Sequence, residues 1–483
     1  MNKFYRNLIL ISIVLISIIM HFNHFSKDLI SIHVWRQAQT QSSLINFYEE
    51  DMNILNPRRN DRGNGDGIFR MEFPLMQWIV ACGYKVFGNH LIITRIFMFI
   101  IGLFSIFGIY RLIITLFQNE IMALIAAWTF NFSPSFYYYT INPLPDNFAL
   151  CCSIWGVAMF FYWYRQNKIY LLMISGLLLS VGALCKLPFI LYFSVPLTYF
   201  IIYGIKNGVK QKIILEIILT LSYIVFPIIW YLSVVPQWHG NGIVKGILDN
   251  DVPFSTILNY LQFNLFSTLP ELLLNYGSLI FFLFGFYFII KNKAFKHYLF
   301  PLFVVWSFAI LGYFLFEINL IAKVHDYYLF PFYPILFIIV SYGAYYLFSY
   351  KNRIVKYFMF FLLLILPFTT YIRMHDRWNS DSLGFNKDLL KYKNELRNAV
   401  PKNALCIAGN DKSNFIFFYY IDKKGWGFQD DNFNKESITE MIKKGATYLY
   451  SDSRQIESNK NIIPYLEKLI LEKGTIRIYK LKK

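Results

Sequence analysis

Long apolar segments, each suited to cross a bilayer as an α-helix, recur along most of the chain. A helix that spans a membrane needs roughly 20 predominantly apolar residues. We expect such helices at residues 91–117, 121–141, 147–164, 169–185, 188–204, 213–235, 272–290, 298–316, 327–349 and 354–372. An earlier apolar run, residues 8–20, follows Lys3 and Arg6 like a signal peptide but lacks a small-residue cleavage site, which indicates an uncleaved anchor. The pattern predicts about eleven spans.

From about residue 373 charged residues become frequent and apolar runs shorten. We expect short strands at residues 404–408, 415–421, 447–450 and 476–481, and helices at residues 436–444 and 462–472. The predicted fold is an all-α polytopic membrane bundle over residues 1–372, followed by a small soluble α/β domain over residues 373–483. A large polar loop, residues 26–73, separates the first two spans, and residues 73–87 are suited to a short or re-entrant helix.

The composition supports a membrane bundle. Hydrophobic residues make up 56% of the 483 residues, and the 50 Phe and 36 Tyr are typical of helices in lipid with aromatic belts at the interfaces. The 5 Cys do not indicate a disulfide framework, because Cys151, Cys152 and Cys185 lie inside apolar runs.

The net charge of +17 is explained by the loops rather than by a nucleic-acid partner. Short cytoplasmic loops are rich in Lys and Arg, and every second loop of this chain fits that rule. The basic residues of these loops are Arg165, Lys168, Lys206, Lys210, Lys212, Lys291, Lys293, Lys296, Lys351, Arg353 and Lys356. They fall on the same side as Lys3 and Arg6. We therefore expect a multi-pass membrane protein with a cytoplasmic N-terminus and an extracytoplasmic C-terminal domain.

The first outer loop contains candidate binding residues. On a helix beginning near Ser31, the residues His33, Arg36, Gln37 and Thr40 would share one face, which could meet a phosphate and an acceptor. The alternative is a solvated amphipathic helix that lies on the membrane.

The same loop then combines glycines with arginines and carboxylates. Its candidate residues for holding an anionic headgroup are Arg58, Arg59, Arg62 and Arg70, with Asp66 as a further pocket residue. These arginines lie on the predicted outer side, against the positive-inside rule, which favours a ligand as the reason for them.

Further ionisable residues lie at the outer ends of other spans. Asp146 opens one span, where it can cap a helix or take part in function. Lys186 lies between two spans on that side, and Glu317 and His239 also face outward. The candidate pocket residues at the start of a later span are Lys323, His325, Asp326 and Tyr327. Carboxylates, cations and a His at one face are suited to hold a lipid-linked phosphate and to deprotonate an acceptor hydroxyl.

These motifs, in their order along the chain, resemble those of bacterial membrane glycosyltransferases of the C type (GT-C). They are residues 33–40 (HVWRQAQT), 72–78 (EFPLMQW), Phe87-Gly88, Arg95, Pro145-Asp146 and 325–328 (HDYY). The similarity covers about the first 370 residues. Within this class the chain is most similar to the branch related to protein O-mannosyltransferases and to the lipid A aminoarabinose transferase. The resemblance implies transfer of a hexosyl or pentosyl group from a polyprenyl-phosphate-linked sugar to a lipid, glycan or protein acceptor, with inversion at the anomeric carbon.

The resemblance also implies roles for single residues. Glu72 and Asp146 match acidic residues of the family, and Arg36 matches the arginine of its first-loop motif. Many relatives have an acidic residue at the position of His33, so the candidate bases are Glu72, Asp146 and His33. Phe73 replaces a family lysine, so we expect the phosphate to be neutralised by the loop arginines or Lys186.

The sequence leaves open whether a metal ion binds, and whether the chain is a transporter or a scaffold instead of an enzyme. Glu72 and His239 are candidate ligands for a divalent cation, although no spacing requires one. A transporter or flippase of a lipid-linked sugar would use the same cationic pocket without a base. A non-catalytic membrane scaffold is the third alternative. The expected partners are membrane lipids, the lipid-linked donor and the acceptor.

Overall fold

A computed structural model describes residues 2–63, 65–208, 210–238, 246–248 and 252–482. The chain folds into two compact units. The first unit contains Met1–Phe25, Met71–Phe73 and Thr94–Asp376, and the second contains Ser26–Arg70, Pro74–Ile93 and Arg377–Lys483. Segments that are consecutive in sequence, such as those on either side of Met71, therefore belong to different units.

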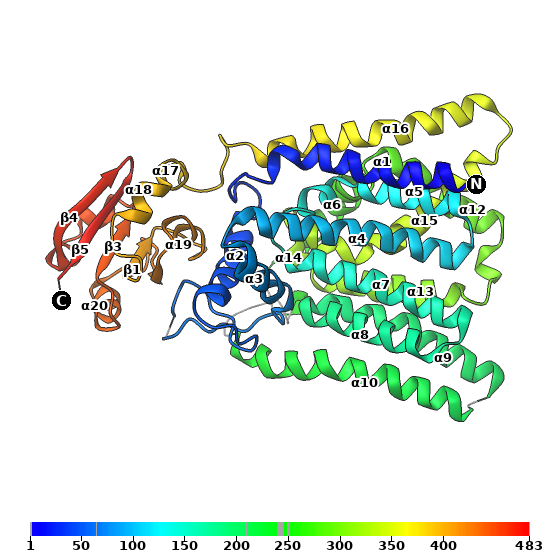
Figure 1. The fold of residues 1–483 in the computed structure, drawn as a ribbon, viewed down its shortest axis with the longest axis horizontal. Coiled ribbons are helices and arrows are strands. Elements are labelled where there is room, and N and C mark those ends of the chain that lie inside the picture. The colour runs from blue at the N-terminus through cyan, green and yellow to red at the C-terminus, as the bar shows by residue number, and fades with distance from the viewer. Residues whose placement is uncertain (1, 64, 209, 239–245, 249–251, 483) are drawn as a thin grey trace. The chain divides into compact units, whose positions relative to one another are not determined.

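The first unit is a bundle of helices (Figure 1). It contains α1 (Lys3–His21), most of α4 (Leu91–Phe117), α5 (Glu120–Asn131), α6 (Pro134–Tyr139), α7 (Pro145–Gln166), α8 (Ile169–Cys185), α9 (Ser194–Asn207), α10 (Gln211–Val234), α11 (Phe254–Phe263), α12 (Gly277–Lys291), α13 (Phe300–Phe316), α14 (Ile318–Ile321), α15 (Tyr333–Phe348) and α16 (Arg353–His375). Short irregular helical segments connect them, among them η2 (Leu187–Phe193), the π-helix η6 (Asn264–Leu273) and η8 (Asp326–Phe332).

Several of these helices are long and apolar enough to cross a membrane. Within the described ranges there are seven, or up to eight if the bent pair Phe254–Leu273 and Gly277–Lys291 forms one span. Shorter apolar helices include α8 and α13, each of 17 residues. The chain is thus a multi-pass membrane protein, as predicted, while the count of about eleven spans stays a prediction.

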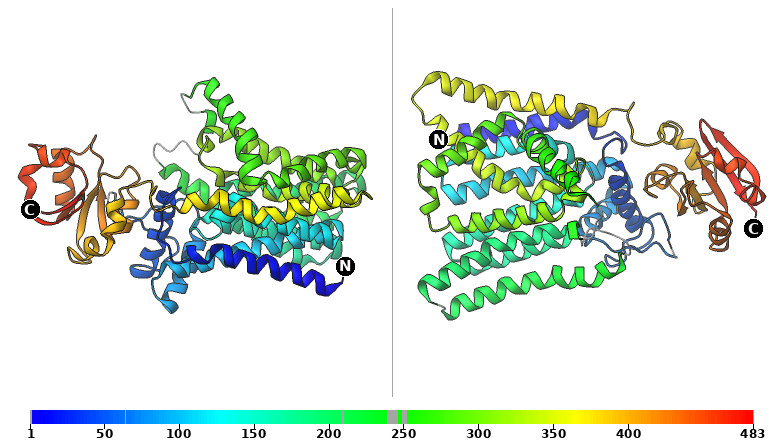
Figure 2. Two further views of the ribbon diagram at one scale, coloured as in Figure 1. Left: turned by 90° about the horizontal axis from the view of Figure 1, so that it is seen from above. Right: turned by 180° about the vertical axis from the view of Figure 1, so that it is seen from behind.

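Neighbouring helices of the bundle pack in pairs, with α7 against α8, α8 against α10 and α12 against α15 (Figure 1 and Figure 2). Glycines allow the last pair to approach closely. A Cβ added at Gly343 would lie 2.0 Å from the Phe281 carbonyl oxygen, and one at Gly285 would lie 2.4 Å from that of Ile339. Close packing of this kind is a main source of helix association in lipid.

Two predicted spans differ in detail. The run at residues 121–141 is divided into α5 and α6, because Pro134 lacks the N–H of a continuous helix and disfavours helical backbone at Ser133. The run at residues 272–290 begins as a regular helix only at Gly277, after η6, which contains Pro270 and is bent by 112° from α12. Neutral polar residues and prolines at these breaks do not interrupt the hydropathy pattern, so the sequence did not reveal them.

The second unit combines helices with a five-stranded sheet. Its helices are α2 (Val34–Glu49), α3 (Leu75–Phe87), α17 (Lys387–Lys391), α18 (Lys393–Asn398), α19 (Ile416–Ile421), α20 (Lys435–Lys443) and α21 (Gln455–Ser458). Its strands are β1 (Leu405–Gly409), β2 (Lys424–Gly427), β3 (Tyr448–Ser451), β4 (Leu466–Lys473) and β5 (Ile476–Leu481). The strand order is β2-β1-β3-β5-β4, with β1 parallel to β2 and β3, and β5 antiparallel to β3 and β4.

Each face of this sheet is covered by a different helix. Ala408 of β1 and Tyr450 of β3 belong to one apolar core together with α19. Ile407 and Leu449, the preceding residues in each strand, belong to a second core together with Ile438 of α20. This alternation is expected for strands that are buried on both faces.

The structure corrects two predicted elements of this unit. Residues 415–421, expected as a strand, form α19, because a short apolar run has no periodicity that separates a buried helix from a strand. Residues 462–472, expected as a helix, lead into β4, which forms a hairpin with β5 through Gly474 in the left-handed conformation, φ +60°. Strand β2 was not predicted. The bounds of the other predicted strands, and of the helix at residues 436–444, agree with the structure within one or two residues. The predicted fold class, a helical membrane bundle with a small α/β domain, is also confirmed.

Candidate active site

Three ionisable side chains with little exposure to solvent meet in the first unit. The ammonium nitrogen of Lys186 lies 3.3 Å from a carboxylate oxygen of Glu72 and 3.3 Å from one of Asp146. The exposed fractions of the three side chains are 10% for Lys186, 12% for Glu72 and 2% for Asp146. We call Glu72, Asp146 and Lys186 the acidic-lysine cluster. With two carboxylates and one ammonium group, it carries one net negative charge.

Backbone contacts fix the segment that carries Glu72. The N–H of Phe73 donates to the carbonyl of Leu184 at 2.9 Å, and the indole N–H of Trp230 donates to the carbonyl of Met71 at 3.0 Å. Phe73 also packs edge-on against Trp230, with 5.0 Å between ring centroids. Glu72 is therefore held between the end of α8 and α10 by the residues on both sides of it.

The other two members lie at helix ends. Asp146 is in the first turn of α7, where Pro145 supplies a favourable first residue and a carboxylate is stabilised by the helix dipole. Lys186 follows the last residue of α8, and its N–H donates to the carbonyl of Gly182 at 3.0 Å. The helix dipole thus favours the carboxylate of Asp146 at this position, although the N-cap is Leu144 and no side chain caps the helix, and the ion pair with Lys186 adds a second role.

Aromatic side chains surround the ammonium group. The Lys186 nitrogen lies 4.8 Å from the ring centroid of Tyr328 and 5.9 Å from that of Tyr327, within the range of cation–π contacts. The next residue toward the N-terminus, Asp326, accepts hydrogen bonds from the hydroxyls of Tyr139, at 2.7 Å, and Ser135. The predicted residue Tyr327 therefore contacts the Lys186 ammonium group of the acidic-lysine cluster, and the predicted residue Asp326 is next to Tyr327 in the chain.

Two titratable groups at neighbouring positions have shifted pKa values. Glu317, which follows α13, is 6% exposed, and burial raises its pKa to about 7 against the opposing charge of Lys186. Burial lowers the pKa of His325, and the carbonyl of Leu320, 2.7 Å from its Nδ1 atom, offsets this only in part. His325 is therefore neutral at pH 7, whereas Glu317 titrates near it.

Not every predicted pocket residue of this unit joins the cluster. Lys323 is exposed, and its ammonium group lies 5.3 Å from the ring centroid of Phe263. Conversely, sequence reasoning missed Ser135 and Tyr139, which are neutral residues in an apolar run and give no charge signal.

The predicted phosphate-binding arginines belong to the second unit, where they pair with nearby residues. Arg58 lies 3.7 Å from Glu50, Arg62 pairs with the same carboxylate, and Arg59 lies 3.5 Å from Asp61. The guanidinium carbon of Arg59 also lies 4.4 Å from the Phe69 ring centroid. Arg70 donates to the Leu55 carbonyl at 2.7 Å. The side chain of Asp66 accepts from the Ile68 N–H at 3.0 Å. These contacts order the loop, and a role in phosphate binding stays a prediction.

Lys424 of β2 also pairs with Glu50. Burial opposes the charge of Glu50, but hydrogen bonds from Arg62 and Lys424 outweigh it and lower the pKa of this carboxyl. The arginine loop is thus tied to the sheet of its own unit through one carboxylate.

The predicted helix at His33 begins later than expected. Regular helix starts at Val34, and His33 precedes it with a left-handed backbone, φ +56°. His33 is therefore outside the helical register that would have placed it on one face with Arg36 and Thr40. Arg36 is buried in α2 and donates to the Gln39 side chain at 2.5 Å.

Comparison with known proteins places this geometry in a family context. The sequence model of the dolichyl-phosphate-mannose-protein mannosyltransferase family matches residues 72–231. No curated protein sequence matches the chain. The chain is similar in structure to ArnT from Cupriavidus metallidurans bound to undecaprenyl phosphate, with 10% identity over 99% of this chain and 98% of that chain and a TM-score of 0.68. The apo state of the same protein gives 11% identity, 97% coverage of each chain and a TM-score of 0.66.

A third similar structure is the oligosaccharyltransferase AglB from Archaeoglobus fulgidus in complex with an inhibitory peptide and a dolichol-phosphate. It shares 12% identity over 94% of this chain and 70% of that chain, with a TM-score of 0.60. These proteins are glycosyltransferases with the GT-C fold.

The chain has the GT-C fold. The resemblance drawn from the sequence motifs is therefore confirmed. The family match begins at Glu72 and includes Asp146 and Lys186, so the whole acidic-lysine cluster lies in the matched part of the GT-C bundle.

A metal site was left open by the sequence. Among the residues that the structure describes, no three His, Cys, Asp or Glu side chains are grouped so that they could hold a metal ion. His239, the expected partner of Glu72 in such a site, lies outside the described residues. Glu72 is paired with the ammonium group of Lys186 instead. A divalent cation held by Glu72 and His239 therefore stays a prediction.

Proposed function

We propose that this chain is a glycosyltransferase that moves a sugar from a polyprenyl-phosphate donor to a hydroxyl group of a cell-envelope acceptor. The observation that carries the proposal is the acidic-lysine cluster, which combines a buried cation with two carboxylates in the family-matched part of the bundle. A structure of the similar protein ArnT contains undecaprenyl phosphate, which supports a lipid-linked phosphate as the donor.

The cluster offers the two charges that this reaction needs. The acceptor oxygen attacks the anomeric carbon, the bond from that carbon to the phosphate oxygen breaks, and the acceptor proton passes to a carboxylate. Attack from the face opposite the phosphate inverts the anomeric carbon. Lys186 neutralises the leaving phosphate, which is a stronger effect in a buried site than in water.

We assign the proton-accepting role to Glu72. A base must reach the acceptor hydroxyl, and the side chain of Glu72 is 12% exposed whereas that of Asp146 is 2% exposed. Asp146 then acts as a positioning residue that holds Lys186. His33 is the alternative base. Donor binding and thermal stability, measured on variants in which the loop arginines or Arg36 are neutralised, would separate a role of these residues in donor binding from a role in folding.

The charge pattern supports an orientation. The turns that follow α7, α9, α12 and α15 lie at the end of the bundle where the N-terminus lies (Figure 1). Those turns carry the basic residues that mark the cytoplasmic side, whereas Asp146 and Lys186 lie at the opposite ends of α7 and α8. We therefore propose that transfer takes place at the outer face of the cytoplasmic membrane.

The test is transfer of a radiolabelled sugar by the purified protein in proteoliposomes. The donors are undecaprenyl-phosphate hexoses and pentoses, and the acceptor is a cell-envelope extract. We expect labelled acceptor with wild-type protein and with the exposed-site control Asp381→Asn, and an inverted anomeric linkage by NMR of the product. Movement of the donor across the bilayer without transfer would favour a flippase, and failure of both would favour a scaffold; either result contradicts the proposal.

A further inference from the structure

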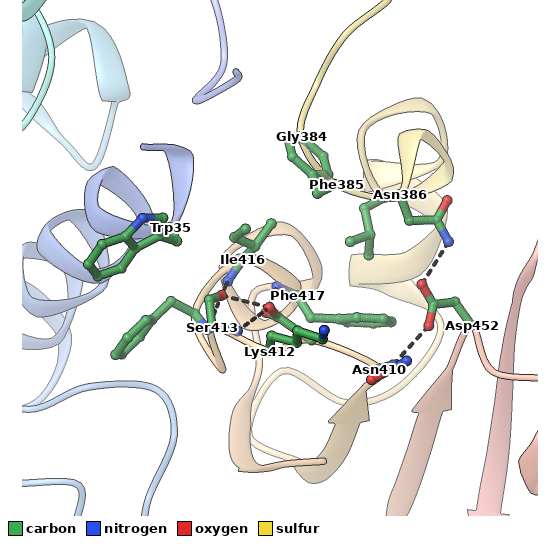
Figure 3. A pocket seen from close by; sticks show the side chains of 13 residues that line it. Trp35, Gly384, Phe385, Asn386, Asn410, Lys412, Ser413, Ile416, Phe417 and Asp452 are labelled. Carbon is green, nitrogen blue, oxygen red and sulfur yellow. Dashed lines mark hydrogen bonds between the residues drawn. The ribbon is translucent and has the colours of Figure 1, made fainter. Parts of the chain in front are cut away.

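We propose that the second unit binds a neutral saccharide in a cavity at the carboxyl ends of β1 and β3. The cavity has a volume of about 590 Å³, within the range of about 300–1,000 Å³ that is typical of small-molecule sites. Figure 3 shows Trp35 of α2 at one side of it and Asn386, Asn410 and Asp452 at the other.

The topology of the sheet explains why a cavity opens here. The chain passes from β1 through α19 to β2 on one side of β1, then through α20 to β3 on its other side. Helix α19, which follows β1, packs in the core on one face of the sheet, and Ile456 of α21, which follows β3, belongs to the core on the other face, so the loops after β1 and β3 leave the sheet in different directions. In parallel sheets, ligands bind in the crevice outside the carboxyl ends of two such strands.

Polar side chains in the cavity are fixed by hydrogen bonds before a ligand binds. One carboxylate oxygen of Asp452 accepts from the backbone N–H of Asn410 at 2.8 Å, and the other accepts from the side-chain amide of Asn386 at 2.8 Å (Figure 3). A carboxylate can accept about four hydrogen bonds, so both oxygens keep acceptor capacity. Two adjacent acceptors held in one plane match a pair of neighbouring hydroxyl groups.

Asn410 contributes a donor, and hydrogen bonds hold the loop in which it lies. The amide of Asn410 donates to Asp430 at 3.1 Å and has a second N–H. Ser413 donates its hydroxyl to Asp411 at 2.6 Å, and Asp411 in turn accepts from the N–H of Phe417 at 2.9 Å. The loop after β1 is therefore rigid, and little conformational entropy is lost when it binds a ligand.

Aromatic rings form the other part of the lining. Trp35 is partly buried against the apolar core that contains Phe415 and Phe417, and all three residues line the cavity. Flat aromatic faces pack against the C–H groups of a sugar ring, while hydroxyl groups at the ring edge meet Asp and Asn side chains. This combination of one indole, a carboxylate and amides favours a saccharide over a purely apolar ligand.

The charges of the lining select a neutral ligand. Asp411 and Asp452 oppose a phosphate or a uronic acid, and Lys412 is the single cation of the described lining. In the proposed reaction, this unit would bind a saccharide that is part of a glycan acceptor. This role in acceptor binding rests on the proposed function. Binding itself does not depend on it.

The experiment measures binding of neutral trisaccharides of glucose, mannose, galactose and N-acetylglucosamine to the full chain in nanodiscs by saturation-transfer NMR. A mannose trisaccharide that carries one phosphate is the anionic probe. We expect at least one neutral probe to bind, with the affinity reduced about tenfold or more by Asp452→Asn and by Trp35→Leu. Trp35→Phe keeps an aromatic face and should retain binding. Asp431→Asn, at an exposed position outside the lining, is the matched control for the Asp452 variant.

Thermal unfolding of each variant identifies a loss of folding, and the Trp35→Phe and Trp35→Leu pair tests the ring even if Asp452→Asn unfolds. Binding of the anionic probe alone, absence of binding by every neutral probe, or equal binding by the Leu and Phe variants would overturn the inference. A transfer assay run in parallel separates the two proposals. Transfer by wild-type protein without saccharide binding contradicts this inference only, and saccharide binding without transfer contradicts the proposed function only.

Discussion

Removing the shared cation of the acidic-lysine cluster should strongly destabilise the first unit. In Lys186→Met, Glu72 and Asp146 would remain as two buried carboxylates without the ammonium group that lies 3.3 Å from each. Coulomb's law at 3.3 Å, with an effective dielectric constant of about 20, gives about 5 kcal/mol for each pair. The cost of desolvating the lysine offsets part of this attraction, so we expect the free energy of unfolding to fall by about 3–5 kcal/mol.

A second substitution should partly reverse this effect. Asp146→Asn keeps the shape of the side chain and removes one of the two carboxylate charges. In the double variant Lys186→Met/Asp146→Asn only Glu72 remains charged, and the mutual repulsion of the two carboxylates is absent. We therefore expect the double variant to be more stable than the sum of the two single changes predicts, by about 0.5–3 kcal/mol.

The assay is thermal unfolding of wild type, both single variants and the double variant in the same nanodiscs, followed by near-ultraviolet circular dichroism. Lys206→Met, at an exposed position near the end of α9, is the matched control and should stay within about 0.5 kcal/mol of wild type. Unchanged stability of Lys186→Met, or purely additive effects in the double variant, would refute the electrostatic reasoning.

Three further predictions concern other features of the two units. Burial raises the pKa of Glu317 to about 7, so the stability that the protonated side chain contributes is complete below pH 4.5 and is lost as the pH rises through 7. In unfolding curves measured between pH 5 and 8, the free energy of unfolding of Glu317→Gln should therefore not show this decrease with pH. Burial raises the pKa of Glu50, but Arg62 and Lys424 together outweigh burial and lower it, so the stabilising contribution of Glu50 is present above pH 4.5 and is lost as the pH falls further. Glu50→Gln should cost about 1.5–3 kcal/mol at pH 7 and increase proteolysis of residues 51–70, and an unchanged cleavage rate would contradict the ion pair's role. Gly343→Ala would place a methyl group 2.0 Å from the Phe281 carbonyl and should lower the unfolding temperature, whereas Gly312→Ala, with nothing within 4 Å, should not.

Much of the membrane bundle could be predicted from hydropathy, because lipid requires long apolar helices whatever their packing. The breaks within the bundle could not. Ser133 and Pro134 divide one apolar run without changing its hydropathy, and residues 415–421 form a helix because tertiary packing decides the structure of a short apolar run.

The candidate site was predictable in part for a similar reason. Asp146 and Lys186 stand out because ionisable residues at the ends of spans are costly, and Glu72 stands out because it matches an acidic residue of the family that the motifs resemble. Their meeting point is set by the packing of α7, α8 and the segment before α3, which no local pattern encodes. The pairing of Arg58 and Arg62 with Glu50 was also hidden, because all three residues look like solvated loop charges in the sequence.

The most direct test of the central claim compares transfer by Glu72→Gln with transfer by wild type in the radiolabelled proteoliposome assay, with donor binding measured separately on the same preparations. If Glu72 accepts the acceptor proton, the variant should bind the undecaprenyl-phosphate sugar as wild type does and transfer it about 10²–10⁴-fold more slowly. Glu436→Gln, an exposed change of the same kind in α20, should leave the rate unchanged. Equal transfer rates for Glu72→Gln and wild type would contradict the account.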